Sequence, residues 1–372
     1  MIILWVVLAL IGLPLLALGL YFLKAIVQGA VEGWRGGGDE DGEYELPAAA
    51  AALGLLPPER QNTKSAAPVP AVLTAAIDAA KSGDWQPAAA LLDVTATERD
   101  WEYRAFHVER LASLAAEDDT WLLAWETARR DDPGAALLRA RSTVRLAWDI
   151  RGGKRAKYTT SEQFEGFHRM LARSREEHVR AAALAPDGDP TPYIGEIWTG
   201  LGLGSPHSEM DRLWKEISQR APHHYEAHFS ALQYWCAKWR GSEELARAFA
   251  ARAAEDAPPG SLMTAFPLIA HFEHDDSDAA DGDRTPEMRA LVDAALTDVA
   301  AADPAHPRLP EVRHLLAYYL CLQDRDEAAV EQFRLVDGYV GALPWRYRGD
   351  PAGEFCRMRD LSLANTGEGV PG

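Results

Sequence analysis

The fold is decided by residues 221–258, which read APHHYEAHFSALQYWCAKWRGSEELARAFAARAAEDAP. The stretch begins and ends with an Ala-Pro pair, and Gly241 divides it into two segments with helical spacing of apolar residues. Because proline lacks the amide proton that a helix interior needs, each Ala-Pro pair marks a helix end. Ser242 followed by two glutamates is typical of a helix start. The stretch therefore predicts two helices joined near Gly241.

The pairing of a residue with a proline at a helix end recurs along the chain. Ala185-Pro186 and Ala257-Pro258 each lie thirty-six residues from Ala221-Pro222. Asp132-Pro133 and Asp303-Pro304 extend the series at longer intervals, which inserted segments explain. A period in the thirties with proline at the end of each unit is typical of stacked helix-turn-helix units. Since valine- or isoleucine-rich strand patterns do not stand out, we expect an all-α fold, an antiparallel helix-hairpin solenoid over residues 71–362.

In these features residues 72–340 resemble a tetratricopeptide-type array, with small residues such as Ala246 and Ala250 at packing positions and proline at unit ends. The chain departs from that family in its period, which is thirty-six rather than thirty-four, and it lacks the Trp-x-x-Leu-Gly-x-x-Tyr signature. Residues 239–250 also resemble a segment of uncharacterised bacterial helical-repeat proteins. The first resemblance implies a curved solenoid whose concave face binds a protein or peptide.

The N-terminal segment has a different character, since no side chain from Met1 to Leu23 is charged. As a helix this run would span ~34 Å, enough to cross a hydrocarbon core of roughly 30 Å. A cleaved signal peptide would need a basic start and a shorter apolar core. We therefore expect residues 1–24 to form one transmembrane helix. Because Lys24 and Arg35 follow it and no basic residue precedes it, the rest of the chain is expected on the cytoplasmic side.

Residues 25–70 are predicted to be a flexible linker, because glycines, an acidic run and then Pro57, Pro58, Pro68 and Pro70 follow one another without a repeating apolar face. Residues 363–372 are predicted to be a disordered tail. The net charge of −18 and the pI near 5.1 disfavour a nucleic-acid-binding protein, which normally needs a basic face. Three widely spaced cysteines indicate neither a disulfide framework nor a thiolate zinc site, and they fit a reducing compartment.

Three histidines, His223, His224 and His228, lie close together in the quoted stretch. His224 and His228 are four residues apart, so on a helix both would face one side, where they could share a metal ion. The order His-Glu-x-x-His of zinc proteases is absent, and the repeat spacing gives His228 a packing position. A structural role is therefore the favoured interpretation. A metal-dependent enzyme using His224 and His228 is the alternative.

A second set of possible ligands lies in an acidic insertion, where two histidines precede a run of aspartates. A calcium loop needs acids at alternating positions before a glycine, and Gly282 does not have them, so a solvated loop is favoured. These residues are His271, His274, Asp275, Asp276 and Asp278.

Two further motifs each have two possible interpretations. The glycines of Gly200-x-Gly202-x-Gly204 suit a phosphate-binding loop, but no strand precedes them, which favours a turn between helices. One basic cluster either contacts anionic lipid headgroups or forms a solvated loop, the favoured interpretation. It consists of Arg151, Lys154, Arg155 and Lys157.

Glu226, Phe229 and Gln233 fall on one stripe of the first helix in the quoted hairpin. Because the first helices of stacked hairpins line the concave side, these three residues are predicted to contact a partner. Phe229 is the strongest candidate, since an aromatic side chain flanked by polar residues is typical of an interface anchor. The alternative is that Phe229 packs in the core, where Trp235 is also expected.

The sequence contains no recognisable catalytic or cofactor-binding motif, and no metal site is predicted. We therefore expect a membrane-anchored interaction module that recruits an unidentified protein or peptide at the cytoplasmic face of a membrane. A purely structural spacer is a further possibility.

Overall fold

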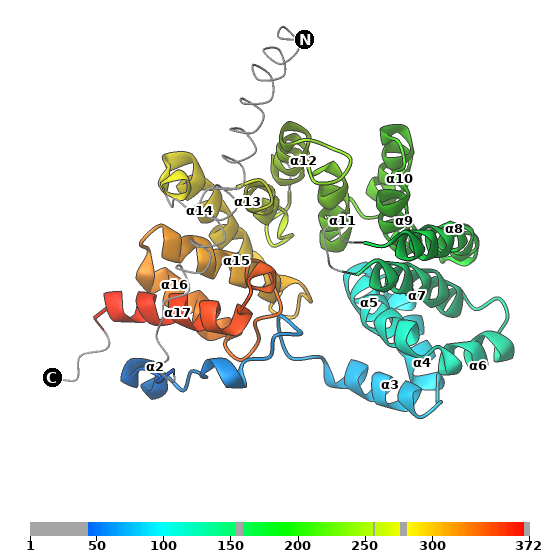
Figure 1. The fold of residues 1–372 in the computed structure, drawn as a ribbon, viewed down its shortest axis with the longest axis horizontal. Helices are drawn as coiled ribbons and strands as arrows, with labels where there is room; N and C mark the ends of the chain where they lie inside the picture. Colours follow the sequence, from blue (N-terminus) through cyan, green and yellow to red (C-terminus); the bar gives the residue numbers. More distant parts are fainter. Residues whose placement is uncertain (1–43, 153–158, 256, 276–280, 368–372) are drawn as a thin grey trace, which may run out of the picture. The chain divides into compact units, whose positions relative to one another are not determined.

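The structure is a computed structural model that describes residues 44–152, 159–255, 257–275 and 281–367. These residues form helices joined by short connections, as Figure 1 shows, and the described ranges contain no strand beyond one isolated bridge between Asn62 and Tyr339. The predicted all-α class is confirmed. The compact unit begins at Leu46.

The helices follow one another in this order: α2 (Ala48–Ala52), α3 (Ala71–Lys81), α4 (Gln86–Glu98), α5 (Trp101–Glu117), α6 (Thr120–Ala128), α7 (Pro133–Arg151), α8 (Ser161–Leu184), α9 (Thr191–Leu203), α10 (His207–Arg220), α11 (Tyr225–Trp235), α12 (Glu243–Glu255), α13 (Phe266–Phe272), α14 (Pro286–Ala301), α15 (Leu309–Leu322), α16 (Asp326–Val336) and α17 (Pro351–Asn365). Short 3₁₀ turns include η1 (Pro58–Arg60), η3 (Met263–Ala265), η4 (Gly282–Arg284) and η5 (Trp345–Tyr347).

The predicted helix ends at the Ala-Pro pairs are confirmed. Helices α8 and α10 end shortly before Pro186 and Pro222, and the quoted hairpin consists of α11 and α12. Gly241 is required between them because a β-carbon there would lie 1.8 Å from the carbonyl oxygen of Trp235. The hydroxyl of Ser242 accepts a hydrogen bond from the backbone N–H of Leu245 at 3.2 Å, as expected of a residue that caps a helix.

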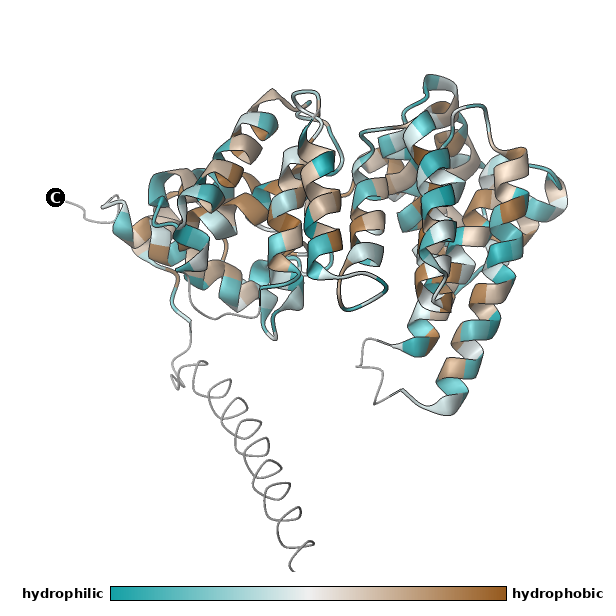
Figure 2. Cartoon of the chain, turned by 90° about the horizontal axis from the view of Figure 1, so that it is seen from above, coloured by the Kyte–Doolittle hydropathy of each residue, from teal (hydrophilic) through white to brown (hydrophobic). Residues whose placement is uncertain are grey.

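Successive helices pack on each other in pairs, among them α3 with α4, α9 with α10, α11 with α12, and α15 with α16. A second set of contacts joins the odd-numbered helices α5, α7, α9 and α11, so they form an inner layer. Figure 2 shows hydrophobic and hydrophilic residues on different sides of many of these helices. Most buried apolar residues of α9 to α17 form one continuous cluster, and most of those of α3 to α7 form a second.

The segment of residues 46–66 belongs to the folded unit, which corrects the prediction that the linker extends to residue 70. Figure 1 shows this blue segment beside α17. Asn62 exchanges backbone hydrogen bonds with Gly338 and Val340, at 2.9 and 2.7 Å. The buried guanidinium of Arg359 in α17 donates to the carbonyl oxygen of Leu56 at 2.8 Å. The segment therefore supplies backbone partners to Arg359 of α17 and to the backbone between α16 and η5.

Both ends of the chain lie partly outside the described residues. The run Met1–Leu23, predicted to span a membrane, is outside them, and no helix within them is long and apolar enough for that role. At the other end α17 continues to Asn365, and Leu363 is buried. The predicted tail of residues 363–372 therefore begins with helix, and residues 368–372 lie outside the described part.

Candidate functional site

The stripe predicted to line a groove faces other inner segments of the fold. The side chains of Glu226 and Gln233 are buried, and Phe229 is half-buried. Glu226 contacts Arg308, and the amide nitrogen of Gln233 donates to Glu273 at 2.7 Å. The two polar residues of the stripe are therefore already engaged within the chain. Trp235, predicted to be core, is half-buried and packs against the main apolar cluster.

Arg308 is the centre of a charged cluster that joins three helices. Its guanidinium lies 2.6 Å from Glu109 of α5, 3.0 Å from Glu226 of α11 and 2.7 Å from Glu311 of α15. Only 5% of the Arg308 side chain is exposed. Burial acts to lower the pKa of Arg308, but the charges of the three glutamates outweigh it and hold this pKa well above its usual value. Arg308 therefore stays charged and holds the three helices together.

The glutamates of this cluster respond differently to their surroundings. Burial acts to raise the pKa of Glu109, but the nearby arginines, Arg308 foremost, lower it to about 2. For Glu226 burial is the larger effect, and it raises the pKa despite the opposing charge of Arg308. Arg141 of α7 lies 3.9 Å from Glu226 and adds a second positive charge. The cluster is a structural clamp between sequence-distant elements.

Phe229 belongs to a second group of side chains, which we call the aromatic–arginine patch. The patch consists of Phe229, Phe272, Arg346 and Tyr347. The guanidinium of Arg346 lies over the ring of Phe229 at 5.4 Å and over that of Tyr347 at 5.8 Å. Arg346 is exposed, and its side chain makes no hydrogen bond or ion pair with the described residues. Tyr347 is 52% exposed. Sequence reasoning missed Arg346 and Tyr347, although the alternation in Trp345-Arg346-Tyr347-Arg348 was a signal.

The structure does not make His224 and His228 into a ligand pair. His224 caps α11, where its Nδ1 accepts a hydrogen bond from the backbone N–H of Ala227 and its Nε2 donates to the carbonyl oxygen of Trp101. Neither nitrogen is left to bind a metal. His228 donates from Nδ1 to the carbonyl oxygen of His224, and its ring packs against Trp214. Burial lowers the pKa of His228 to about 4.

The structure describes the three glycines of the glycine motif and one residue of the basic cluster. Gly200 and Gly202 lie within α9, and Gly204 ends that helix with a φ of 69°. A β-carbon at Gly202 would lie 2.4 Å from Leu171, so this glycine lets α8 approach α9 closely. Arg151 lies over the ring of Trp148 at 5.5 Å. The other members of the basic cluster, Lys154, Arg155 and Lys157, lie outside the described residues.

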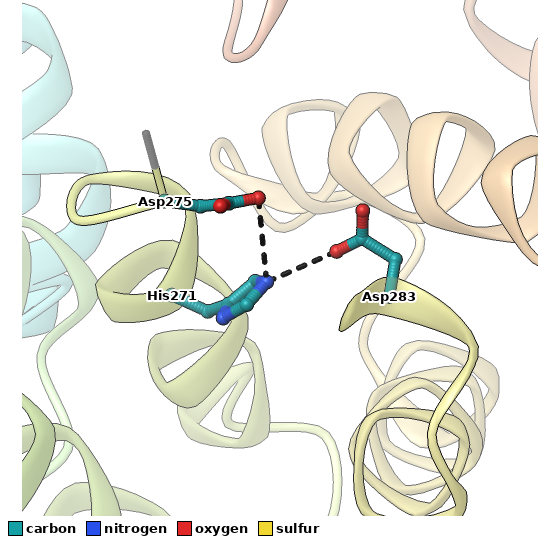
Figure 3. A group of neighbouring side chains, drawn as sticks. All are labelled: His271, Asp275 and Asp283. Carbon is teal, nitrogen blue, oxygen red and sulfur yellow. Dashed lines mark hydrogen bonds and ion pairs between the residues drawn. The ribbon is translucent and has the colours of Figure 1, made fainter. Parts of the chain in front are cut away.

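The ends of the acidic insertion meet at His271, as Figure 3 shows. The Nε2 atom of His271, at the end of α13, lies 3.0 Å from an oxygen of Asp283 in η4 and 3.8 Å from one of Asp275. Asp283 is buried, His271 is half-buried, and Asp275 is exposed. Sequence reasoning named His271 and Asp275 but missed Asp283. Asp276 and Asp278 lie outside the described residues, whereas His274 bonds two backbone groups.

Comparison with known proteins leaves the chain without an assigned relative: no family model, curated protein or solved structure matches it.

Proposed function

We propose that the chain is a membrane-attached interaction scaffold, a tetratricopeptide-like array whose partner binds at the aromatic–arginine patch. The observation that carries this proposal is Arg346, a charged side chain held across two rings and not paired within the described residues. The paired helices and their inner layer support it, since such arrays offer extended surfaces to partners. Aromatic and arginine side chains dominate the energetics of protein interfaces.

The chemistry of the patch favours an acidic peptide segment as the partner. The ring faces of Phe229 and Tyr347 hold the guanidinium of Arg346 in place, so less rotamer entropy is lost when it binds a carboxylate. Tyr347 adds exposed aromatic area, and its ring lies 5.8 Å from that of Phe272. A carboxylate next to an apolar side chain would satisfy both parts of the patch.

Site-specific photocrosslinking in native membranes tests this proposal. A photoreactive phenylalanine analogue at Tyr347 should give a discrete crosslinked product, and the same analogue at Leu123 should not. Leu123 is the matched control because it is 51% exposed but lies on α6, away from the patch. Arg346→Ala should abolish the product at Tyr347, whereas Arg173→Ala, on α8, should preserve it. Equal products at both positions, or a product that survives Arg346→Ala, would refute the patch as the binding surface.

Attachment to a membrane rests on the uncharged run Met1–Leu23 and is tested separately. The full chain should stay with membranes after an alkaline carbonate wash, and a chain beginning at Leu46 should not. A reporter fused to the C-terminus should be active only if it works in the cytoplasm, because Lys24 and Arg35 follow the run. Release of the full chain by the wash would exclude an integral anchor.

A further inference from the structure

We propose that His271, Asp275 and Asp283 form a binding site for one divalent transition-metal ion, independent of the partner-binding function. One ligand atom from each residue lies within 4.8 Å of the others. Figure 3 shows the side chains converging from the two ends of the acidic insertion, with both aspartates directed at the same imidazole nitrogen.

The spacing of the ligand atoms suits a metal ion. Imidazole nitrogen and carboxylate oxygen bind zinc at about 2.0–2.2 Å, so neighbouring ligands in a tetrahedral site lie roughly 3.3–3.6 Å apart. The two distances from Nε2 of His271, 3.0 Å to Asp283 and 3.8 Å to Asp275, lie on either side of that value. The third distance, between the two carboxylate oxygens, is at most 4.8 Å, so these atoms would have to draw closer together to bind one ion.

The electrostatics of the cluster also favour a cation. The side chain of Asp283 is only 7% exposed, and no lysine or arginine pairs with it in the described ranges. A buried carboxylate is costly unless a positive charge or several hydrogen bonds compensate it. The Nε2 atom of His271 carries at most one proton, so it offers at most one N–H to the neighbouring carboxylates. A metal ion at this position would contact both aspartates and accept the lone pair of His271.

The donor set indicates the class of metal. One imidazole nitrogen and two carboxylate oxygens suit Zn²⁺, Co²⁺ or Mn²⁺, whereas Mg²⁺ and Ca²⁺ bind oxygen ligands. Three protein ligands leave at least one position for water. Because Asp275 and Asp283 stand on either side of the insertion, the ion would fasten the connection between α13 and α14.

Metal titration of the full chain in mild detergent, without a histidine tag, tests this site. Calorimetry with Zn²⁺ should give one ion per chain, and Co²⁺ should give the visible absorption bands of a nitrogen- and oxygen-ligated ion. Mg²⁺ and Ca²⁺ at the same concentration should not compete. Asp275→Asn and His271→Gln should each weaken Zn²⁺ binding about tenfold or more, since each removes a charged or nitrogen ligand.

Two matched variants separate a defined site from general acidity. Asp281→Asn removes an exposed acid next to η4 that is not in the cluster, and His274→Gln removes a histidine whose ring nitrogens bond the backbone. Both should leave the affinity for Zn²⁺ within about twofold of the parent, on the reasoning that ligand identity determines affinity. Absence of saturable binding, or an equal loss in Asp281→Asn and Asp275→Asn, would overturn the proposal. Since Asp275 is exposed, its variant decides the matter even if the His271 variant misfolds.

Discussion

Replacing Arg308 with methionine removes the positive charge that three glutamates share. Breaking a buried ion pair from one side typically costs about 3–5 kcal/mol. Here Glu226 would be left with 11% of its side chain exposed, but Glu109 and Glu311 are 39% and 25% exposed and keep some solvent. We therefore expect a loss of about 3 kcal/mol in the free energy of unfolding, the lower end of that range.

The loss should depend on pH in a defined direction. In the parent the pKa of Glu109 is lowered to about 2, so its contribution to stability is present above the ordinary value of 4.5 and disappears as the pH falls toward 2. In the variant the raised pKa of Glu226 has no nearby Arg308 to oppose it, which destabilises the fold further as the pH rises through that pKa. Both effects make the difference between parent and variant larger at pH 7 than at pH 4.

Urea denaturation at the two pH values, followed by circular dichroism, measures this difference. Arg173→Met is the matched control, because Arg173 is 57% exposed and makes one pair along a helix, worth less than about 0.5 kcal/mol. The double variant Arg308→Met/Glu226→Gln should recover roughly half of the loss, since the buried charge is gone. A loss in Arg308→Met as small as that of the control would show that the cluster does not hold the helices together.

Three further predictions concern stability. A chain beginning at Ala71 should unfold at a lower urea concentration than one beginning at Leu46, by about 3 kcal/mol or more, since it loses buried apolar surface and hydrogen-bond acceptors for α17. Equal stabilities would show that residues 46–70 are dispensable. Four histidines have a pKa that burial lowers to about 4, so they resist protonation in the fold, and stability should fall as the pH drops from about 6.5 to 4. They are His107, His178, His228 and His314. Urea midpoints that stay constant across this range would contradict it. Phe229→Ala should cost about 1–2 kcal/mol, less than the ~3–5 kcal/mol of the fully buried control Phe266→Ala. Equal losses in melting experiments would place Phe229 in the core.

Much of the helical pattern was predictable because its causes are local. A proline is excluded from a helix interior and therefore marks a helix boundary, and Gly241 is needed where the chain turns back on the end of α11. The stripe of Glu226, Phe229 and Gln233 was correctly grouped on one helix for the same reason, since side chains three and four residues apart share a face. What that face meets depends on residues far along the chain, such as Arg308, so its burial was not predictable.

In the candidate sites, too, residues close in sequence were predicted together, whereas residues far apart in sequence were not. His271 and Asp275 lie one turn apart and were noticed together, but Asp283 joins them only because the chain returns after the insertion. Arg346 reaches Phe229 across more than a hundred residues. Residues 46–66 have the composition of a linker, and yet they are held by backbone hydrogen bonds that do not depend on side-chain pattern.

The sequence by itself determined the helical class, the ends of many helices and the apolar N-terminal run, because backbone geometry and burial propensity act over a few residues. Tertiary structure alone decided which charges are buried together, where the folded unit begins and which aromatic rings remain exposed. Those outcomes depend on contacts between distant segments, whose formation no local pattern encodes.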